Sequence, residues 1–349
     1  MARRALIRGA AVSLTLAMGL GSPAVGTAQG ETVAGEVVVP ATTAMLPQTS
    51  LLSAGPSGFL RYEYGRGHLW TTYDGVDTVV DASATGVYGL PEFGAGSDVV
   101  AAYDESGRVV TLRDMRSGRS RTIPLPARHE YWATLGSTVV TLAGTQGSDI
   151  TWHLLDVRDD GSVTDRTVAG VPQGIYAFNE RNAALGDAHG QIVTWRVDRD
   201  SFTGWLDVDQ NRLITLPYTV SRGYPFAALT ATHLLWWDDG IAHIASRRDL
   251  TATPRTEPVR DVGQLLGMVG DTLVVSRYDS ALGPLNYGLP VWRVDSVPLD
   301  GSPGKTLLAR SSWRAVPTPD GGLLVPGGPG TDQWGVSLIE PAGGAVTPP

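Results

Sequence analysis

Short apolar stretches alternate with turns rich in Gly, Asp and Ser throughout residues 51–340, and almost no stretch shows the 3.6-residue period of an amphipathic helix. The run from Val109 to Asp114 is representative, because apolar and polar residues mix over six positions and an acidic residue ends it before the turn at Ser117-Gly118. Short β-branched runs between such turns are typical of strands. The pattern therefore predicts an all-β protein built from short antiparallel strands.

The acidic residues that end these runs recur at a regular spacing. Successive members lie 40 to 51 residues apart, and the series consists of Asp74, Asp114, Asp156, Asp198, Asp249, Asp295 and Glu340. A period of about 40–50 residues is typical of a β-propeller, in which each repeat forms one blade. Seven members predict a β-propeller with seven blades of four antiparallel strands, in a single domain over residues 51–349. A β-sandwich is the alternative, but this length would need two domains, and no linker divides residues 51–340.

Two segments resemble the blades of known propellers. Gly107 to Asp114 with Ser117-Gly118 resembles a blade of the WD40-like and quinoprotein-like propellers, and Pro319-Asp320-Gly321-Gly322 resembles the turn of TolB-type blades. The sequence of the whole chain resembles those of secreted actinobacterial propeller proteins, including those that carry FG-GAP repeats. This resemblance implies a fold and no particular activity. We place no quinone-binding residues in this chain and expect no cofactor.

Several tryptophans recur inside the expected strands. Trp70, Trp152, Trp195 and Trp292 stand three or four residues before the acidic strand ends, which predicts packing between neighbouring blades. Trp236 and Trp237 are adjacent, so in a strand their rings point to opposite faces and one of them is less buried. Asp239-Gly240 then predicts a tight hairpin turn.

The N-terminus has the order of a secretory signal peptide over residues 1–28. Arg3, Arg4 and Arg8 form a positive region, an 11-residue apolar run follows from Ala10 to Leu20, and small residues lead to Ala28, after which we expect cleavage. A membrane-anchoring helix is the alternative, but it needs about 20 apolar residues. The paired arginines leave the Sec and twin-arginine routes open. We therefore expect a secreted, extracellular protein with no membrane segment after signal removal.

Residues 29–50 are rich in Ala, Thr, Gly and Pro and are typical of a linker, except for the β-branched run from Glu36 to Val39. A propeller must pair the free strand edges of its first and last blades. Little more than one short strand could follow Glu340, so we expect the closing strand to come from the N-terminal side. Glu36 to Val39 is the first candidate and Leu51 to Ala54 the second.

Composition excludes several classes of protein. With 35 acidic residues against 27 basic ones and a net charge of -8, the chain has no basic surface for nucleic acid. The absence of Cys excludes a disulfide scaffold, a thiolate metal site and a cysteine nucleophile. We expect a monomer with a protein or carbohydrate ligand.

Catalytic motifs are incomplete. His129-Glu130 begins like the zinc-protease motif His-Glu-x-x-His, but Ala133 stands where the second ligand belongs. The six His residues are isolated along the sequence, so no local metal cluster is predicted.

One segment begins like a calcium loop. Asp207, Asp209 and Asn211 place three oxygen-bearing side chains at alternating positions, which makes them a candidate calcium site. Arg212 stands where such loops have Gly, and Tyr218 stands where the closing acid belongs, so an Asx-rich turn is the alternative.

These observations favour a binding or interaction module in the extracellular or cell-envelope space, with a protein or glycan ligand. A secreted glycan-active hydrolase or lyase is the alternative, since such propellers bring carboxylates from different blades to the central channel without any local spacing. The side chains that line the channel therefore decide between binding and catalysis.

Export is directly testable. We expect the mature protein to begin near Gln29 and to be recovered outside the cytoplasmic membrane, because the order of residues 1–28 is that of a cleaved signal. N-terminal sequencing of secreted material checks this. Retention of Met1 in a membrane fraction would contradict it.

Overall fold

The computed structural model describes residues 33–40, 49–63, 65–81, 96–144, 150–158, 160–172, 177–179, 185–197, 200–220, 227–278, 292–311, 315–328 and 335–340. Every regular element in these ranges is a β-strand. Nowhere in them is there a helical segment with the length and hydrophobicity needed to cross a bilayer. The expected signal peptide, residues 1–28, lies outside the described residues.

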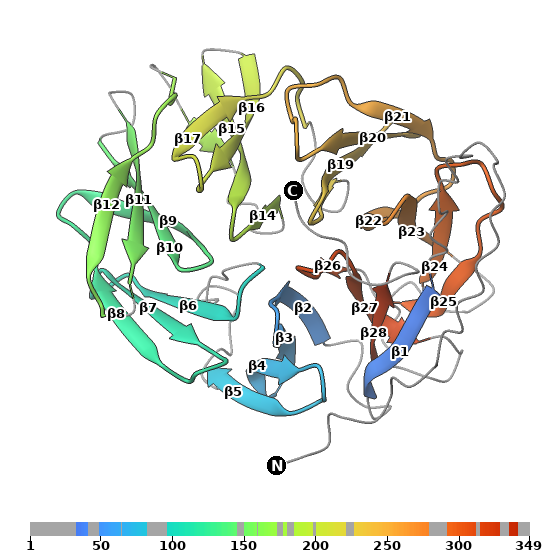
Figure 1. Cartoon of the computed structure of the whole chain (residues 1–349), viewed down its shortest axis with the longest axis horizontal. Helices are drawn as coiled ribbons and strands as arrows, with labels where there is room; N and C mark the ends of the chain where they lie inside the picture. Colours follow the sequence, from blue (N-terminus) through green and yellow to red (C-terminus); the bar gives the residue numbers. More distant parts are fainter. Residues whose placement is uncertain are drawn as a thin grey trace, which may run out of the picture.

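The described strands form six sheets arranged around a central axis, and five of these sheets are separate blades (Figure 1). The first two blades consist of β2 (Thr49–Ala54), β3 (Gly58–Glu63), β4 (Gly67–Thr72) and β5 (Asp77–Asp81), then β6 (Val99–Asp104), β7 (Val109–Asp114) and β8 (Ser120–Pro124). The third consists of β9 (His129–Leu135), β10 (Thr138–Ala143), β11 (Thr151–Val157) and β12 (Val163–Thr167).

The fourth and fifth blades complete the separate units. They consist of β13 (Ala177–Asn179), β14 (Gly186–Asp187), β15 (Gly190–Val197), β16 (Asp200–Asp207) and β17 (Arg212–Thr215), then β18 (Ala227–Leu229), β19 (His233–Asp238), β20 (Ile241–Ser246) and β21 (Arg255–Pro258).

One eight-stranded sheet occupies the rest of the ring. It contains β22 (Gln264–Val269), β23 (Thr272–Tyr278), β24 (Trp292–Pro298), β25 (Thr306–Ser311), β26 (Val316–Pro317), β27 (Leu323–Gly328), β28 (Gly335–Glu340) and β1 (Val33–Pro40). All its strand pairs are antiparallel.

The all-β propeller is confirmed. Among the described residues, five sheets are separate blades and one sheet has eight strands, which differs from the seven separate four-stranded blades that the sequence predicts. In the eight-stranded sheet, β25 pairs with β27 through Arg310 opposite Gly328 and Ser311 opposite Gly327, and these two pairs join β22 to β25 with β26 to β28 and β1 in one sheet. The separate blades also vary from three to five strands. The spacing of the acidic strand ends gives the number of residues in each repeat. It does not predict which strands form hydrogen bonds with each other along their edges.

Apolar side chains from neighbouring sheets pack together between the blades. One core cluster combines Trp152 of β11 with Trp195 of β15, and both are essentially unexposed, as is Trp70 of β4. The prediction that these three tryptophans pack between blades is thus confirmed. Trp292 of β24 is only partly buried and lies edge-on to the exposed Tyr278.

The hairpin between β19 and β20 also agrees with the sequence. Trp236 is buried against one neighbouring blade and Trp237 packs, partly buried, on the opposite face. Asp239 and Gly240 have φ values of 46° and 82°, as a two-residue turn of type I′ requires.

The first strand of the chain pairs with the last. β1 lies antiparallel to β28, with Val33 opposite Glu340 and Pro40 opposite Gly335, and it forms the outer edge of the eight-stranded sheet (Figure 1). Glu36 to Val39, the first candidate for the closing strand, lies inside β1. The second candidate, Leu51 to Ala54, lies inside β2 and pairs with β3 instead. Backbone pairing between segments 300 residues apart therefore covers an edge that would otherwise be exposed.

The contribution of β1 to stability can be measured. Deleting residues 29–40 should lower the melting temperature by several degrees and increase aggregation, because β28 would present an unpaired edge. Val37→Pro should act in the same direction because proline cannot donate a ladder hydrogen bond, whereas Val37→Thr keeps the donor and serves as the matched control. Differential scanning calorimetry measures the shift. If the deletion and Val37→Pro both melted at the temperature of the unsubstituted protein, β1 would contribute nothing to closure.

Candidate functional site

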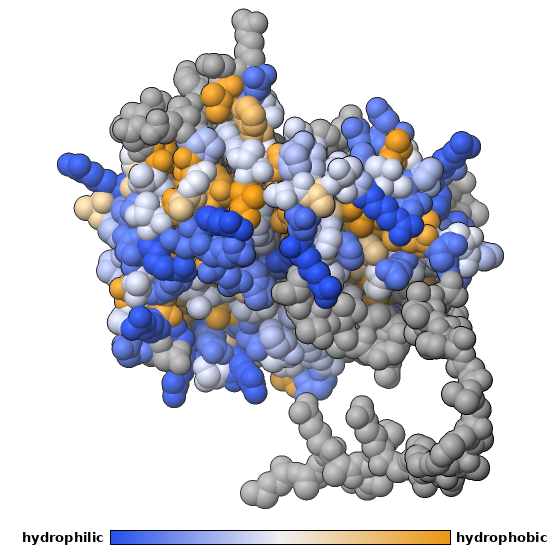
Figure 2. Space-filling model, turned by 45° about the horizontal axis from the view of Figure 1, so that its top comes forward, coloured by the Kyte–Doolittle hydropathy of each residue, from blue (hydrophilic) through white to orange (hydrophobic). Residues whose placement is uncertain are grey.

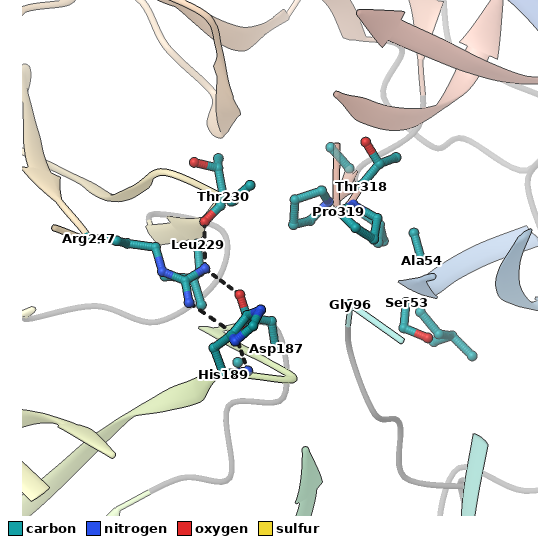
Figure 3. A pocket seen from close by; sticks show the side chains of 16 residues that line it. Ser53, Ala54, Gly96, Asp187, His189, Leu229, Thr230, Arg247, Thr318 and Pro319 are labelled. Carbon is teal, nitrogen blue, oxygen red and sulfur yellow. Dashed lines mark hydrogen bonds and ion pairs between the residues drawn. The ribbon is translucent and has the colours of Figure 1, made fainter. Parts of the chain in front are cut away.

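The innermost strands end together at one mouth of the central channel. Ala54, Asp187, Leu229 and Pro317 are the last residues of β2, β14, β18 and β26, and all four line a pocket of about 80 Å³ on the axis (Figure 3). Because these strands all enter the ring in the same direction, their ends bring together residues from blades far apart in sequence.

One side of this pocket is held by an ion pair between two blades. Arg247 follows β20 and pairs with Asp187 of β14, and its Nη1 also donates to the Thr230 carbonyl oxygen at 3.0 Å (Figure 3). The side chains of Arg247 and Asp187 are only 6% and 18% exposed. A well-packed pair of this kind is costly to break, because the remaining charge is left partly buried without a partner.

Trp205 of β16 lies beneath the guanidinium of Arg247, which is 5.0 Å from the ring centroid. Gly190 at the start of β15 makes this position possible, because a Cβ atom there would lie 2.4 Å from the Trp205 ring. The cation over the aromatic face adds an attraction to the ion pair. It also covers the indole, so this ring is not an open platform for a ligand.

A second, larger pocket of about 510 Å³ adjoins the first and opens between the β13–β17 and β18–β21 blades. It shares three lining residues with the axial pocket and is mostly polar; its lining consists of His189, Trp205, Asp207, Asp209, Gln210, Ala231, Arg247 and Arg248. These residues come from the turns after β14, β16, β18 and β20, together with the strand β16 itself.

The three carboxylates around the two pockets each have a protein partner. Besides its ion pair, Asp187 accepts the His189 backbone N–H at 2.9 Å. Asp207 accepts the Gln210 backbone N–H at 2.7 Å. Asp209 lies 2.9 Å from Nδ1 of His189, in an exposed pair. The carboxylates thus help to organise the turns that line the two pockets.

The candidate calcium residues lie in the turn after β16, and their side chains go to different partners. Asp207 and Asp209 line the larger pocket and make the bonds given above. Asn211 instead donates from Nδ2 to the Thr167 carbonyl oxygen at 2.9 Å, with a positive φ of 53°. Calcium binding by these residues stays a prediction.

The structure also joins three residues that are isolated in the sequence. His129, His153 and Asp165 offer ligand atoms that all lie within 4.8 Å of one another. Sequence reasoning missed this cluster, as it missed the Arg247–Asp187 pair, because both depend on which strands become neighbours. The one available signal was that His129, His153 and Asp165 lie within 36 positions of one another, less than the 40 to 51 residues of one expected repeat.

Comparisons with known proteins identify no family for this chain. No family model matches the chain, and no curated protein matches it. Solved structures match at low identity: streptogramin B lyase (7% identity, 89% of this chain and 97% of that chain, TM-score 0.44) and oligogalacturonate lyase from Vibrio parahaemolyticus (10%, 90% and 98%, 0.45). Another is the β-propeller domain of Cps50 from Myceliophteria thermophila (14%, 82% and 98%, 0.37).

The Arg247–Asp187 pair should stabilise the contact between its two blades. Arg247→Leu should lower the free energy of unfolding by about 2–4 kcal/mol, because Asp187 is left partly buried without its partner. Adding Asp187→Asn should recover part of the loss, since the unpaired charge is removed.

Urea denaturation of both single variants and the double variant measures this coupling. Arg248→Leu is the control and should change stability by less than about 0.5 kcal/mol, since Arg248 is exposed. Strictly additive effects in the cycle would mean that the two side chains do not interact.

Proposed function

We propose that this propeller is a secreted binding module that takes a polar, carboxylate-bearing oligosaccharide in the larger pocket beside the channel mouth. The observation that carries the proposal is a concave, polar pocket between two blades, with a volume of about 510 Å³. That volume lies in the range of sites for small ligands, roughly 300–1,000 Å³. The polar lining favours a ligand that is itself rich in oxygen and nitrogen.

Arg248 gives the pocket its anion-binding group. Its side chain lines the pocket, is exposed, and has no hydrogen-bond or ion-pair partner among the residues that the structure describes. A guanidinium binds a carboxylate through two parallel hydrogen bonds. The other guanidinium, Arg247, is already committed to Asp187, so Arg248 is the group that a ligand carboxylate would meet.

A concave site favours a glycan over a protein ligand. In Figure 2, hydrophilic and hydrophobic residues are interspersed over the surface in view. The large exposed hydrophobic side chains belong to different sheets, among them Val79 of β5, Val163 of β12 and Ile241 of β20. Hydrophobic residues scattered singly are normal on protein surfaces and do not mark a docking face.

Binding is favoured over cleavage because Asp187, Asp207 and Asp209 are held by protein partners. The pocket can therefore orient a ligand through charges and amides, and its carboxylates already serve to hold the surrounding turns and the contact between blades in place. Export to the extracellular or envelope space is part of the proposal, and it is supported by the order of residues 1–28.

The proposal is tested by titrating the mature protein with neutral and uronic-acid-containing oligosaccharides in a calorimeter. We expect a uronic-acid oligosaccharide to bind and its neutral counterpart to bind more weakly. Arg248→Gln should weaken the acidic ligand about tenfold, the equivalent of about 1.4 kcal/mol. Arg116→Gln, an exposed arginine in the β7–β8 turn away from both pockets, is the matched control.

The same samples should be assayed for new reducing ends and for unsaturated products. Turnover that depends on Asp207 or Asp209 would support the hydrolase or lyase alternative instead. Absence of binding by every acidic oligosaccharide at millimolar concentration would overturn the proposal.

A further inference from the structure

His129, His153 and Asp165 lie on one face of the third blade. His129 is the first residue of β9, His153 lies in β11, and Asp165 lies in β12. Side chains on one face alternate along each strand, so the face is shared with Tyr131 and Leu155, which pack against the β6–β8 blade. The cluster therefore sits at the boundary between two blades.

This cluster is separate from the pockets at the channel mouth. The turn between β9 and β10 contains Gly136, whose added Cβ would lie 3.0 Å from Ala188, next to the Asp187 side of the axial pocket. His129 is at the opposite end of β9, a strand of seven residues, and so about 20 Å away along the strand.

The three side chains already converge. His153 Nδ1 is 2.8 Å from an Asp165 carboxylate oxygen, and the centroids of the two imidazole rings are 4.4 Å apart. His129 Nδ1 is 3.0 Å from the buried Thr141 hydroxyl. All three ligand atoms lie within 4.8 Å of one another.

We propose that His129, His153 and Asp165 bind a divalent transition-metal ion, and that Zn²⁺ is the ion they fit best. Two imidazoles with one carboxylate are a donor set that Zn²⁺ uses in proteins, with a fourth position left to water or a ligand. Bonds of about 2.0–2.1 Å in a tetrahedral arrangement place ligand atoms roughly 3.3 Å apart. The cluster reaches that spacing through side-chain adjustments alone, with the metal replacing the proton that His153 and Asp165 share.

Thr141 orients one of the ligands. When its hydroxyl accepts from Nδ1–H of His129, the lone pair on Nε2 is the one available to a metal. Partners that fix the tautomer of a ligating histidine in this way are a regular part of metal sites. The Thr141 side chain is fully buried, so its position is set by the packing of β10.

The charges around the cluster set its affinity. Burial lowers the pKa of His129, and the neighbouring His153 lowers it further. Asp165 acts in the opposite direction. Arg108 of the adjacent blade donates to the His129 carbonyl oxygen. Its positive charge lies near His129 and disfavours the binding of a metal cation there. We expect a Kd on the order of 1–10 μM, weaker than in a closed four-ligand site.

The test uses the untagged mature protein after treatment with a chelator. Titration with ZnCl₂ in a calorimeter should show one ion per chain, and the melting temperature should rise by several degrees at saturation, since the ion binds only the folded chain. Co²⁺ in place of Zn²⁺ should give the visible absorption of a tetrahedral site with nitrogen and oxygen ligands.

Variants assign the ion to this cluster. His153→Gln and Asp165→Asn should each weaken Zn²⁺ binding at least tenfold and abolish the Co²⁺ absorption. His233→Gln is the matched control, because His233 contacts the Thr232 hydroxyl and belongs to no such cluster among the described residues. Circular dichroism establishes that each variant is folded.

The pH dependence of binding by the unsubstituted protein gives an independent readout if a variant fails to fold. Metal ligands must be deprotonated to bind, so Zn²⁺ binding should weaken as pH falls. No binding at 1 mM ZnCl₂, or binding that survives both His153→Gln and Asp165→Asn, would overturn the proposal and leave a hydrogen-bonded His–Asp cluster. Because the readout is metal alone, this result is independent of oligosaccharide binding at the channel mouth.

Discussion

Backbone hydrogen bonds between β1 and β28 join the first and last strands of the propeller, and the arrangement of the other strands relies on this pairing. Each blade packs its apolar face on its neighbours, so a blade at an open seam would lose half of its partners and expose a strand edge. With the seam closed, every described blade is buried on both sides by shared clusters such as the one that contains Trp152 and Trp195. The ring is therefore stabilised as a whole.

Closure also positions the candidate site, because the channel mouth is assembled from strand ends of several blades. Asp187 and Arg247 are 60 residues apart and belong to different blades, yet they form an ion pair at the axial pocket, and Arg247 lines both pockets. A small movement of one blade would separate them. The closed ring thus makes the site rigid. The polar groups of the site lie on exposed turns, where a polar residue such as Arg248 stays hydrated and lowers the folding stability little.

Two places in the same scaffold carry different chemistry. The channel mouth combines side chains from the turns of separate blades, whereas the His129, His153 and Asp165 cluster is built within one blade, across three of its strands. His153 lies in register with Thr141 and Thr167, while His129 and Asp165 are each displaced by two residues from the positions in register with it, on the same face. Their side chains span this offset and bring the three ligand atoms together. The cluster therefore needs only local sheet geometry, and the pocket needs the closed ring.

The sequence by itself determined the all-β propeller, the burial of Trp70, Trp152 and Trp195, and the turn at Asp239-Gly240, because alternation, repeat length and turn chemistry are local properties. Glu36 to Val39 could also be identified from the sequence, because the strand that pairs with the free edge of the last blade needs residues that favour β-structure, and β-branched residues do so. Only the tertiary structure decided that β25 joins β27, that Arg247 meets Asp187, and that His129 meets His153 and Asp165. The physical reason is that edge pairing and side-chain convergence depend on three-dimensional register between strands, and residue spacing along the chain does not encode that register.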